Sequence, residues 1–410
     1  MLADFQASEI VGERASIALG ITGGIAAYKA AELVRLLVGA GHTVYPIMTR
    51  WATEFVAPLT FQTLSGHPVR MATAGFADGG IDHIDLIRKC ELLLVAPLTA
   101  NTMAKMAGGL ADNFLTSTYL AHRGKTMVCP AMNTAMLEHP ATRRNMAQLQ
   151  ADGVEVVLGE AGDLACGEVG AGRMAEAATI LDHVRWVLAP KHPFLEGKRV
   201  LVSAGPTQED VDPVRFLTNR SSGKMGLAVA AAFRDAGAEV EVVHGPIHVP
   251  VPARVKARPV RSAADMASVV LSRQPDVDII VMAAAVADFR PRPSTEKLKK
   301  AAFDGALHLD RTQDILATLG QRKRADQCLV GFAAETGSVL ENAAKKIRDK
   351  NLDFIFANDV AAAGLGFAGD RNRLIALNRH GVQHDLGTRD KEALARELVA
   401  YVVHELQHRS

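Results

Sequence analysis

The stretch Ser16-Ile-Ala-Leu-Gly-Ile-Thr-Gly-Gly24 is an apolar run that ends in a glycine-rich turn. The run predicts a buried strand over Ser16–Ile21, and the spacing of leucines and valines after the turn predicts a helix over Ile25–Val38. Glycines close that helix, and Thr43–Met48 reads as the next strand. Further strands are predicted at Leu92–Ala96, Thr126–Cys129 and Val154–Leu158. Strands that alternate with helices indicate a mostly parallel, doubly wound α/β sheet.

The same order of elements starts again in the second half of the chain. Residues 188–198, LAPKHPFLEGK, contain two prolines and mixed charge, which is typical of a linker. We therefore predict a domain at 1–189, a linker at 190–198 and a second domain at 199–410. Both are expected to be α/β domains with Rossmann-like sheets, and the second ends in an antiparallel hairpin. Its predicted elements are strands Arg199–Ser203, Glu239–Val243, Asp278–Met282, Cys328–Phe332 and Asp353–Phe356, helix Lys224–Asp235, and hairpin strands Arg373–Leu377 and Val382–Asp385.

Composition narrows the class of protein. The 46 basic and 45 acidic residues almost cancel, so the net charge gives no reason to expect nucleic acid or an anionic membrane as a partner. The four cysteines, Cys90, Cys129, Cys166 and Cys328, form no CxxC pair, which argues against a disulfide framework. Neither a secretory signal nor an apolar run of about 18 residues is present. We expect a soluble, cytoplasmic protein.

Each half opens with a glycine-bearing turn between a strand and a helix, an arrangement that binds phosphate through backbone N–H groups. The alternative is that these glycines only permit a tight turn. Residues 20–24 lack the GxGxxG spacing of dinucleotide sites, and the next strand ends in Met48-Thr49 where an NAD enzyme would place a carboxylate. A mononucleotide suits the first turn better, and an NAD oxidoreductase is the weaker alternative.

Four segments of the first half resemble the homo-oligomeric flavin-containing cysteine decarboxylases. They are residues 21–29 (ITGGIAAYK), 82–84 (DHI), 130–136 (PAMNTAM) and 165–174 (ACGEVGAGRM). The resemblance implies a flavodoxin-like domain that binds FMN between subunits, usually in trimers arranged as dodecamers. It also implies that His83 is the catalytic base, that Asn133 binds the substrate carboxylate, and that Cys166 lies on a flap and protonates the enethiolate. A buried structural role is the alternative for Cys166. The implied FMN contacts are Thr22, Gly23, Gly24, Ile25, Ala26, Met48, Thr49, Thr99, Ala100, Asn101 and Thr102.

Segments of the second half resemble the phosphopantothenoylcysteine synthetases: residues 202–207 (VSAGPT), 212–226 (DPVRFLTNRSSGKMG), 282–289 (MAAAVADF) and 331–336 (GFAAET). The resemblance implies that Arg215 and Asn219 hold phosphopantothenate and the activated acyl group. It also implies that Lys297 binds the phosphates of the nucleotide and steadies the acyl-transfer transition state. Solvated lysines around 297–300 and capping serines at 221–222 are the plain alternatives. Gln313 stands where relatives commonly have proline, which puts the local geometry in question. The other implied nucleotide or substrate contacts are Ser221, Ser222, Lys224, Met282, Ala283, Ala284, Asp288, Asp314, Ile315, Leu316, Ala317, Phe332, Lys346 and Lys350.

Together the two resemblances imply a bifunctional enzyme of coenzyme A biosynthesis. The ligase half would join cysteine to 4'-phosphopantothenate through an acyl-cytidylate, converting CTP to CMP and pyrophosphate. The decarboxylase half would then convert 4'-phosphopantothenoylcysteine to 4'-phosphopantetheine with FMN. Mg²⁺ is expected with CTP, although the metal ligands are unknown, and the ligase half is expected to dimerise. The alternative is a ligase with a non-catalytic, flavin-binding regulatory domain; the presence of His83, Asn133 and Cys166 argues against it.

Overall fold

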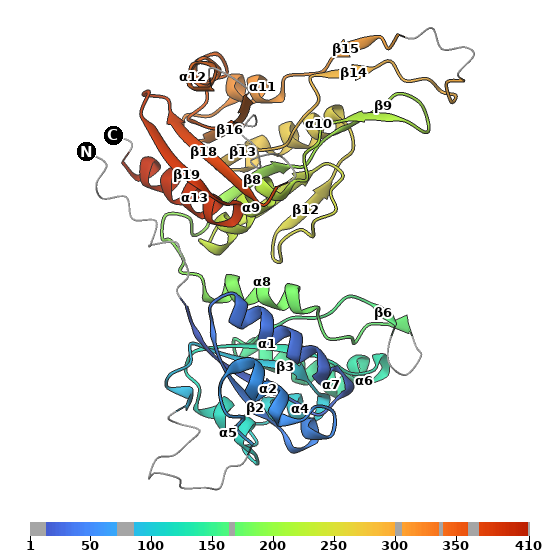
Figure 1. Ribbon diagram of the computed structural model, residues 1–410, viewed down its shortest axis with the longest axis vertical. Coiled ribbons are helices and arrows are strands. Elements are labelled where there is room, and N and C mark those ends of the chain that lie inside the picture. Colours follow the sequence, from blue (N-terminus) through green and yellow to red (C-terminus); the bar gives the residue numbers. More distant parts are fainter. Residues whose placement is uncertain are drawn as a thin grey trace. The chain divides into compact units, whose positions relative to one another are not determined.

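The computed structural model describes residues 14–71, 86–163, 169–299, 306–335, 339–359 and 369–408. They form two compact units, the first ending at Leu188 and the second beginning at Ala189. Figure 1 shows the first unit in blue to green and the second in green to red. In this described part of the chain, no helix is long and apolar enough to cross a membrane.

The N-terminal unit is built on a parallel sheet of five strands in the order β2-β1-β3-β4-β5. This is the flavodoxin-like strand order, which confirms the predicted fold. In the register of β1 and β2, Ile21 lies beside Met48, so the turns after these strands leave the same edge of the sheet. The strands are β1 (Ser16–Ile21), β2 (Thr43–Met48), β3 (Leu92–Leu98), β4 (Lys125–Pro130) and β5 (Glu155–Val156).

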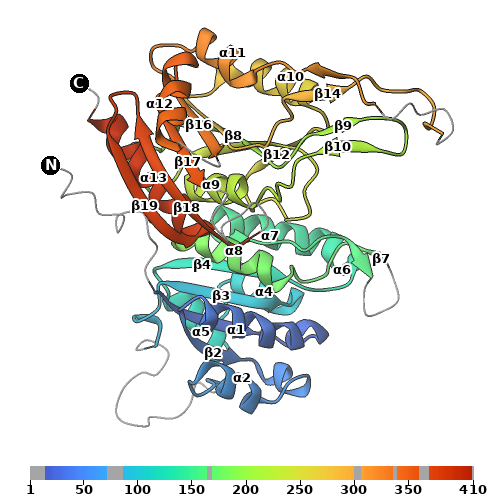
Figure 2. The same ribbon diagram turned by 45° about the horizontal axis from the view of Figure 1, so that its top comes forward.

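Helices cover both faces of this sheet (Figures 1 and 2). Ile17 and Leu19 pack on the face of α1 (Lys29–Gly39), α2 (Pro58–Ser65) and α8 (Ala177–Leu188). Ala18, between them in the strand, points to the other face, as period-two alternation requires. That second face is covered by α4 (Ala100–Ala107), α5 (Phe114–Ala121) and α7 (Pro140–Ala151).

Shorter elements complete the N-terminal unit. The helix predicted over Ile25–Val38 starts as a 3-10 turn, η2 (Ile25–Tyr28), and becomes α-helical only at Lys29. The other short elements are η3 (Arg50–Glu54), α6 (Thr134–Glu138), β6 (Gly162–Asp163) and β7 (Val169–Gly170).

The C-terminal unit contains an eight-stranded sheet in the order β12-β11-β8-β13-β16-β17-β18-β19. The first six strands are parallel, and β18 and β19 are added antiparallel, which confirms the predicted hairpin. The strands are β8 (Arg199–Ala204), β11 (Glu239–His244), β12 (Lys256–Pro259), β13 (Ile279–Met282), β16 (Cys328–Glu335), β17 (Phe354–Asp359), β18 (Arg371–Asn378) and β19 (Gln383–Asp390).

Two helices cover one face of this sheet and three cover the other. The first face packs against α9 (Lys224–Asp235) and α13 (Lys391–Gln407), and α13 contributes Leu398, Tyr401 and Val402 to the core. The second face packs against α10 (Ala263–Arg273), α11 (Ile315–Arg322) and α12 (Val339–Asp349).

Two antiparallel ribbons, which the sequence did not predict, leave one end of this sheet. They are β9 (Gln208–Asp210) with β10 (Phe216–Thr218), and β14 (Phe289–Pro291) with β15 (Leu309–Arg311). Both views show β9 and β14 projecting on the same side (Figures 1 and 2). A hydrogen bond from Ser294 N to Val211 O, 3.0 Å, joins the segments that follow β14 and β9.

The segment predicted as a linker, 190–198, packs onto the C-terminal unit. Leu195 is fully buried in its core. The His192 N–H donates to Ala236 O at 2.9 Å, and Lys191 Nζ donates to Asp235 O at 2.9 Å. In the described chain, the change from one unit to the next therefore falls between Leu188 and Ala189.

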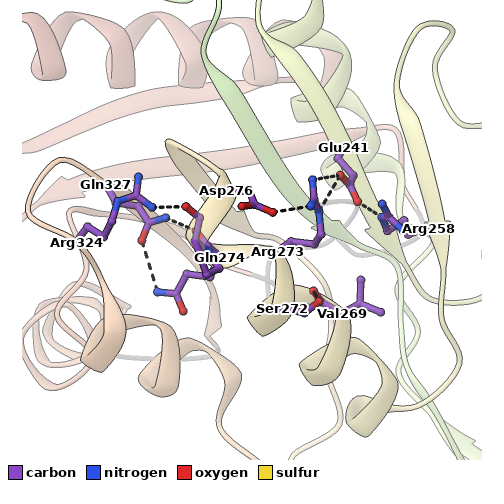
Figure 3. Close-up of polar contacts among 10 residues, drawn as sticks. Glu241, Arg258, Val269, Ser272, Arg273, Gln274, Asp276, Arg324 and Gln327 are labelled. Carbon is purple, nitrogen blue, oxygen red and sulfur yellow. Dashed lines mark hydrogen bonds and ion pairs between the residues drawn. The ribbon is translucent and has the colours of Figure 1, made fainter.

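Polar side chains tie α10 and the following 3-10 turn, η4 (Gln274–Asp276), to neighbouring strands (Figure 3). Buried Glu241 of β11 accepts from Arg258 and from Arg273, whose Nη1 also contacts Asp276 Oδ2 at 2.7 Å. Gln327, just before β16, donates to Gln274 O and Val277 O, both at 2.8 Å. The contacts of Gln327 lie at the amino ends of β13 and β16, away from the carboxyl ends where α/β sheets bind ligands.

Candidate functional site

A cavity of about 580 Å³ lies at the carboxyl edge of the N-terminal sheet. Its walls come from the segments that follow β1, β3 and β4, together with residues 172–174. The resemblance to flavin-containing decarboxylases implied that these segments contribute to one site, and the fold brings them together. The lining residues are Gly23, Gly24, Ile25, Ala26, Tyr28, Lys29, Thr99, Ala100, Ala131, Met132, Asn133, Met136, Gly172, Arg173 and Met174.

Two glycines shape the first turn of this cavity in different ways. A Cβ on Gly23 would lie 2.3 Å from Trp51 Cβ and 2.7 Å from the Trp51 carbonyl carbon, so this position admits no side chain without movement. Gly24 is the N-cap of η2 with φ −162°, which any residue can adopt, and a Cβ there would meet only Thr99 Cγ2 at 3.7 Å. The missing side chain at Gly24 therefore leaves space on the cavity side, whereas the missing side chain at Gly23 lets the backbone pack closely against Trp51.

Thr22 joins the ends of β1 and β3. Its buried hydroxyl donates to Pro97 O at 2.8 Å and accepts from Thr99 N at 3.0 Å. Thr99 is in turn the N-cap of α4, where its hydroxyl accepts from Thr102 N at 3.4 Å. Five predicted FMN contacts do not line the cavity: Thr22, Met48, Thr49, Asn101 and Thr102. Thr22, Met48 and Thr102 are buried, so they lie beneath the residues that line the cavity.

Asn133 is held at the cavity by two interlocked segments. Its Oδ1 accepts from Met136 N at 2.9 Å and so caps α6. The preceding Met132 N donates to Gly172 O at 3.0 Å, and Thr134 Oγ1 donates to Ala171 O at 2.8 Å. Gly172 has φ +126°, and a Cβ there would lie 2.1 Å from Met132 O. His83 and Cys166 lie outside the described residues, so their catalytic roles stay predictions.

The two cationic side chains among the described lining residues of the cavity share one carboxylate. Lys29 Nζ contacts Glu176 Oε1 at 2.8 Å, and Arg173 Nη2 contacts the same oxygen at 3.2 Å. The rest of the described lining is apolar or small, apart from the amide of Asn133 and the hydroxyl groups of Tyr28 and Thr99. Phosphate binding here would draw on backbone N–H groups and helix N-termini, beside two cations that share one carboxylate.

Segments of the C-terminal unit meet at the carboxyl edge of its sheet as well. The end of β8 and the turn after it are joined to the segment after β13 by hydrogen bonds that include Ala284 N to Ser203 Oγ (3.1 Å), Ala285 N to Gly205 O (2.9 Å) and Ala287 N to buried Thr207 Oγ1 (3.0 Å). Asn219 extends this network, because its Nδ2 donates to Ala285 O at 2.9 Å. The predicted substrate residue Asn219 thus lies beside the predicted nucleotide segment Met282–Asp288.

The serine-rich turn leads into α9 through a left-handed glycine. Gly223 has φ +79° and is the N-cap of the helix, and Ser221 Oγ accepts from its N–H at 3.3 Å. A Cβ on Gly223 would lie 2.6 Å from Ile247 Cγ2, so glycine is needed here on two grounds. The next residue, Lys224, forms an ion pair with Asp370 at 2.6 Å. Ser221 therefore has a structural task in addition to its predicted one.

Asp314 links α11 to the end of α12. Its Oδ1 accepts from Ala317 N at 2.9 Å as the N-cap of α11, and its Oδ2 pairs with Lys350 at 2.8 Å. Partial burial alone would raise the pKa of Asp314, but the contact with Lys350 and the backbone N–H groups of Ala317 and Leu316 together outweigh it and lower the pKa. Gln313 donates to Thr318 Oγ1 at 3.3 Å, so the helix cap forms without the proline found in relatives.

Other predicted residues take defined places around this edge. Lys350 N donates to Lys346 O at 3.0 Å, so these two lysines lie one helical turn apart at the C-terminal end of α12. Phe332 packs 5.8 Å from Phe356, measured between ring centroids. Ile315 and Met282 are buried. Among the described residues, no group of three or more His, Cys, Asp or Glu side chains could hold a metal ion.

Arg215 and the loop of Lys297 are brought together by a residue that the sequence argument did not assign. Asp212 accepts from Arg215 Nε at 3.0 Å and from Leu298 N at 3.1 Å. Lys297 itself is exposed beside this contact. The one available signal was the Asp-Pro pair at 212–213, which favours the start of a turn.

Comparison with known proteins matches the two units separately and the chain as a whole. The family described as flavoprotein matches residues 7–188, and the family of DNA/pantothenate metabolism flavoprotein C-terminal domains matches residues 195–406. The coenzyme A biosynthesis bifunctional protein CoaBC of Vibrio cholerae is 43% identical over 95% of this chain and 98% of its own length. The CoaBC protein of Bacillus subtilis is 44% identical over 94% of this chain and 95% of its own.

A crystal structure of the C-terminal domain of a CoaBC protein aligns with 53% of this chain and 99% of its own, at 40% identity and a TM-score of 0.46. The relatives match over both units, which does not favour the alternative of a ligase with a purely regulatory flavin domain. The expected fold class, family and pair of activities are confirmed. The chain belongs to the family of bifunctional coenzyme A biosynthesis proteins, as a phosphopantothenoylcysteine decarboxylase joined to a phosphopantothenate–cysteine ligase.

Proposed function

We propose that the C-terminal unit acts first, joining cysteine to 4'-phosphopantothenate with CTP, and that the N-terminal unit then decarboxylates the product with FMN. The observation that carries this proposal is the convergence, at the carboxyl edge of each sheet, of segments far apart in the sequence. In the N-terminal unit they line one cavity. In the C-terminal unit, hydrogen bonds join the turn after β8 to the segment after β13.

In the ligase, the carboxylate of 4'-phosphopantothenate attacks the α-phosphate of CTP, which releases pyrophosphate and leaves an acyl-cytidylate. The amine of cysteine then displaces CMP and forms the amide. Arg215 and Asn219 hold the phosphopantothenate and the acyl group, and Lys297 stabilises the charge that develops on phosphate. Asp288 contacts the nucleotide, and Lys346 and Lys350 face its phosphates. Mg²⁺ accompanies CTP, because a divalent cation neutralises phosphate oxygens during such a transfer.

In the decarboxylase, the residues around the cavity hold FMN and aim the substrate. When bound, FMN supplies the two-electron redox chemistry that no side chain offers. Its phosphate would lie at the turn after β1, where Gly24 brings no side chain to the start of η2. The cap formed by Asn133 Oδ1 turns its amide NH₂ group away from α6, and such a group can donate to the substrate carboxylate. His83 acts as the base, and Cys166 returns a proton to the enethiolate.

We further propose a cytoplasmic homo-oligomer, a dodecamer in which trimers of the flavin unit are joined by dimers of the ligase unit. Exposed large apolar side chains on both units support such contacts. Trp51 is 72% exposed and Leu59 68% in the N-terminal unit, and Val214 is 60% exposed next to β10. Light scattering of the purified chain tests this assembly, and a monomer at micromolar concentration would contradict it.

A single incubation tests the proposed function. Purified protein is mixed with 4'-phosphopantothenate, cysteine, Mg²⁺ and either CTP or ATP, and the products are identified by mass spectrometry. We expect 4'-phosphopantetheine, CO₂ and CMP with CTP. 4'-Phosphopantothenoylcysteine that accumulates without loss of CO₂ would leave the ligase standing and contradict the role of the flavin unit. Equal product yield with ATP would contradict the assignment of CTP.

A further inference from the structure

The carboxylate of Asp212 lies between the turn that carries Arg215 and the loop that carries Lys297. Its side chain has no exposed surface, whereas the side chain of Arg215 is 52% exposed. Four N–H groups donate to this one carboxylate, one of them 86 residues away in the sequence. A buried acceptor with this many partners does more than close a local turn.

The two oxygens of Asp212 have separate partners. Oδ1 accepts from Val214 N and Arg215 N, both at 2.8 Å, and so closes the turn that begins at Asp212. Oδ2 accepts from Arg215 Nε at 3.0 Å and from Leu298 N at 3.1 Å. One oxygen therefore serves the local turn, and the other reaches the distant loop.

Arg215 completes a clamp on the backbone of Leu298. Its Nη2 donates to Leu298 O at 2.6 Å, while the N–H of the same residue donates to Asp212. Ser294 N, earlier in the loop, donates to Val211 O at 3.0 Å. The backbone beside Lys297 is thus fixed to the 211–215 turn at three points, although the lysine side chain is exposed.

The charge of Asp212 is kept by its surroundings. Burial acts to raise the pKa of this carboxyl, but hydrogen bonds from the N–H groups of Val214, Leu298 and Arg215 and from the Arg215 guanidinium outweigh it and lower the pKa to about 2. Asp212 is therefore an ionised, acceptor-only group at neutral pH, which suits a position that faces four donors.

We propose that Asp212 is a positioning residue for ligation, whose Oδ2 fixes the loop of Lys297 relative to Arg215. This inference rests on the proposed roles of Lys297 and Arg215. One of these cations binds the phosphates of the nucleotide and the other binds phosphopantothenate, so the distance between them sets how the carboxylate meets the α-phosphate. A misplacement of about 1 Å at a reacting centre can cost about 100-fold in rate.

The Asp212→Asn variant tests the role of Oδ2 separately from the role of Oδ1. An asparagine can keep Oδ1 toward Val214 N and Arg215 N, but it places an NH₂ group where Leu298 N and Arg215 Nε also donate. We expect pyrophosphate release from CTP and 4'-phosphopantothenate to fall about 100-fold in kcat, with a smaller change in KM for CTP. Amide hydrogen exchange at Leu298, without any ligand, should become faster. Asp212 would be merely a turn residue if Asp212→Asn kept wild-type kcat and wild-type exchange.

Two controls accompany this variant. Asp310→Asn makes the same chemical change in the exposed ion pair with Arg292 on the β14–β15 ribbon, and we expect ligation to change less than about two-fold, because exposed pairs contribute little. Decarboxylation of supplied 4'-phosphopantothenoylcysteine by Asp212→Asn should equal that of the wild type. A loss there would point to general damage and overturn the assignment.

A double variant tests whether Asp212 acts through Lys297. If it does, Asp212→Asn combined with Lys297→Gln should lose less pyrophosphate release than the product of the two single losses, because the loop then has no lysine to position and only the contact with Arg215 is still disturbed. Fully multiplicative losses would overturn the proposal. Failure of the proposed function looks different: the wild-type protein would then release no pyrophosphate from CTP, whereas the hydrogen exchange at Leu298 would still report on the contact with Asp212.

Discussion

The N-terminal and C-terminal units use the same edge of a parallel sheet, but they prepare it with different groups. Glycines, alanines and methionines make up much of the lining of the N-terminal cavity, and its cations Lys29 and Arg173 share Glu176. In the C-terminal unit, three predicted ligand residues are cations that each have a separate carboxylate partner. The pairs are Lys224 with Asp370, Arg215 with Asp212 and Lys350 with Asp314.

This difference matches the demands of the two proposed ligands. A cofactor with one phosphate stays in its site, and fixed backbone N–H groups are sufficient to hold it. A triphosphate enters with several charges and leaves as pyrophosphate and CMP, so the site needs cationic side chains, and carboxylates pair with them when the nucleotide is absent. The contrast teaches that the carboxyl edge of a parallel α/β sheet can carry either a resident cofactor or a consumed nucleotide, depending on the residues placed after the strands.

The largest expected effect tests whether the two units have separate active sites, as the comparison requires. His83→Asn removes the proposed base, so decarboxylation should fall by about 1,000-fold or more. Ligation should stay within about two-fold of wild type, because it uses the other sheet. CO₂ and pyrophosphate are measured on the same preparation. Parallel loss of both activities would refute separate active sites.

The reciprocal variant, Lys297→Gln, should reduce pyrophosphate release about 100-fold, because a cation that stabilises developing phosphate charge is removed. Decarboxylation of supplied 4'-phosphopantothenoylcysteine should be unchanged. Lys299→Gln, two residues further in the same loop, is the matched control and should retain ligation. If both glutamine variants behave alike, the lysine cluster is only a solvated loop.

The glycines of the first turn sharpen the contrast between packing and ligand binding. Gly23→Ala forces a Cβ to 2.3 Å from Trp51 Cβ, and we expect a loss of about 2 kcal/mol in unfolding free energy. Gly24→Ala has room at 3.7 Å from Thr99 Cγ2, so it should keep stability but bind FMN more weakly. Thermal unfolding of the flavin-free protein and flavin fluorescence titration separate the two effects. Equal instability of both variants would argue against this division.

The smallest expected effect concerns a paired charge of the C-terminal unit. Asparagine is as good an N-cap as aspartate, so Asp314→Asn isolates the ion pair with Lys350. The pKa of Asp314 is lowered in the folded protein; its contribution to stability is therefore present above the unfolded pKa of about 4 and is lost as the pH falls through the folded value.

Because Asp314 is 50% exposed and Lys350 25%, solvent screens the pair, and we expect a loss of only about 0.5 kcal/mol at pH 7. Urea unfolding at several pH values measures it. The difference between wild type and Asp314→Asn should shrink as the pH falls from about 6 to 3. A difference that grows toward acid would show that the assigned sign is wrong.

Strands with strong apolar runs could be predicted from the sequence almost to the residue. Ser16–Ile21 and Thr43–Met48 agree with β1 and β2 in full, because glycine or polar residues bound a continuous buried run. The predicted start of the helix after Gly24 was less accurate. Gly24 provides no side-chain cap, and the chain makes a 3-10 turn before the α-helix begins at Lys29.

The parts that depend on distant pairing could not be predicted. The β14–β15 ribbon joins Phe289–Pro291 to Leu309–Arg311, and the exposed three-residue strands carry no alternation that predicts them. The same limit applies to the sites. The quoted motifs include segments that the fold brings together at the edge of each sheet, whereas the contact of Asp212 with Leu298 joins residues 86 apart in the sequence. Family resemblance indicated which residues to expect at the site, and only the fold shows which other residues hold them in place.

The position of α13 has a consequence for how the protein is made. The core of the C-terminal unit is completed by Leu398, Tyr401 and Val402, which leave the ribosome after every strand of that sheet. The N-terminal sheet, in contrast, has all its strands and its covering helix α8 once residue 188 has emerged. Because domains fold as units in the order of their synthesis, a nascent chain carries a finished flavin unit ahead of a ligase sheet whose apolar face awaits its last helix. A ribosome stalled before Lys391 would therefore expose to chaperones the apolar face that α13 covers in the finished unit.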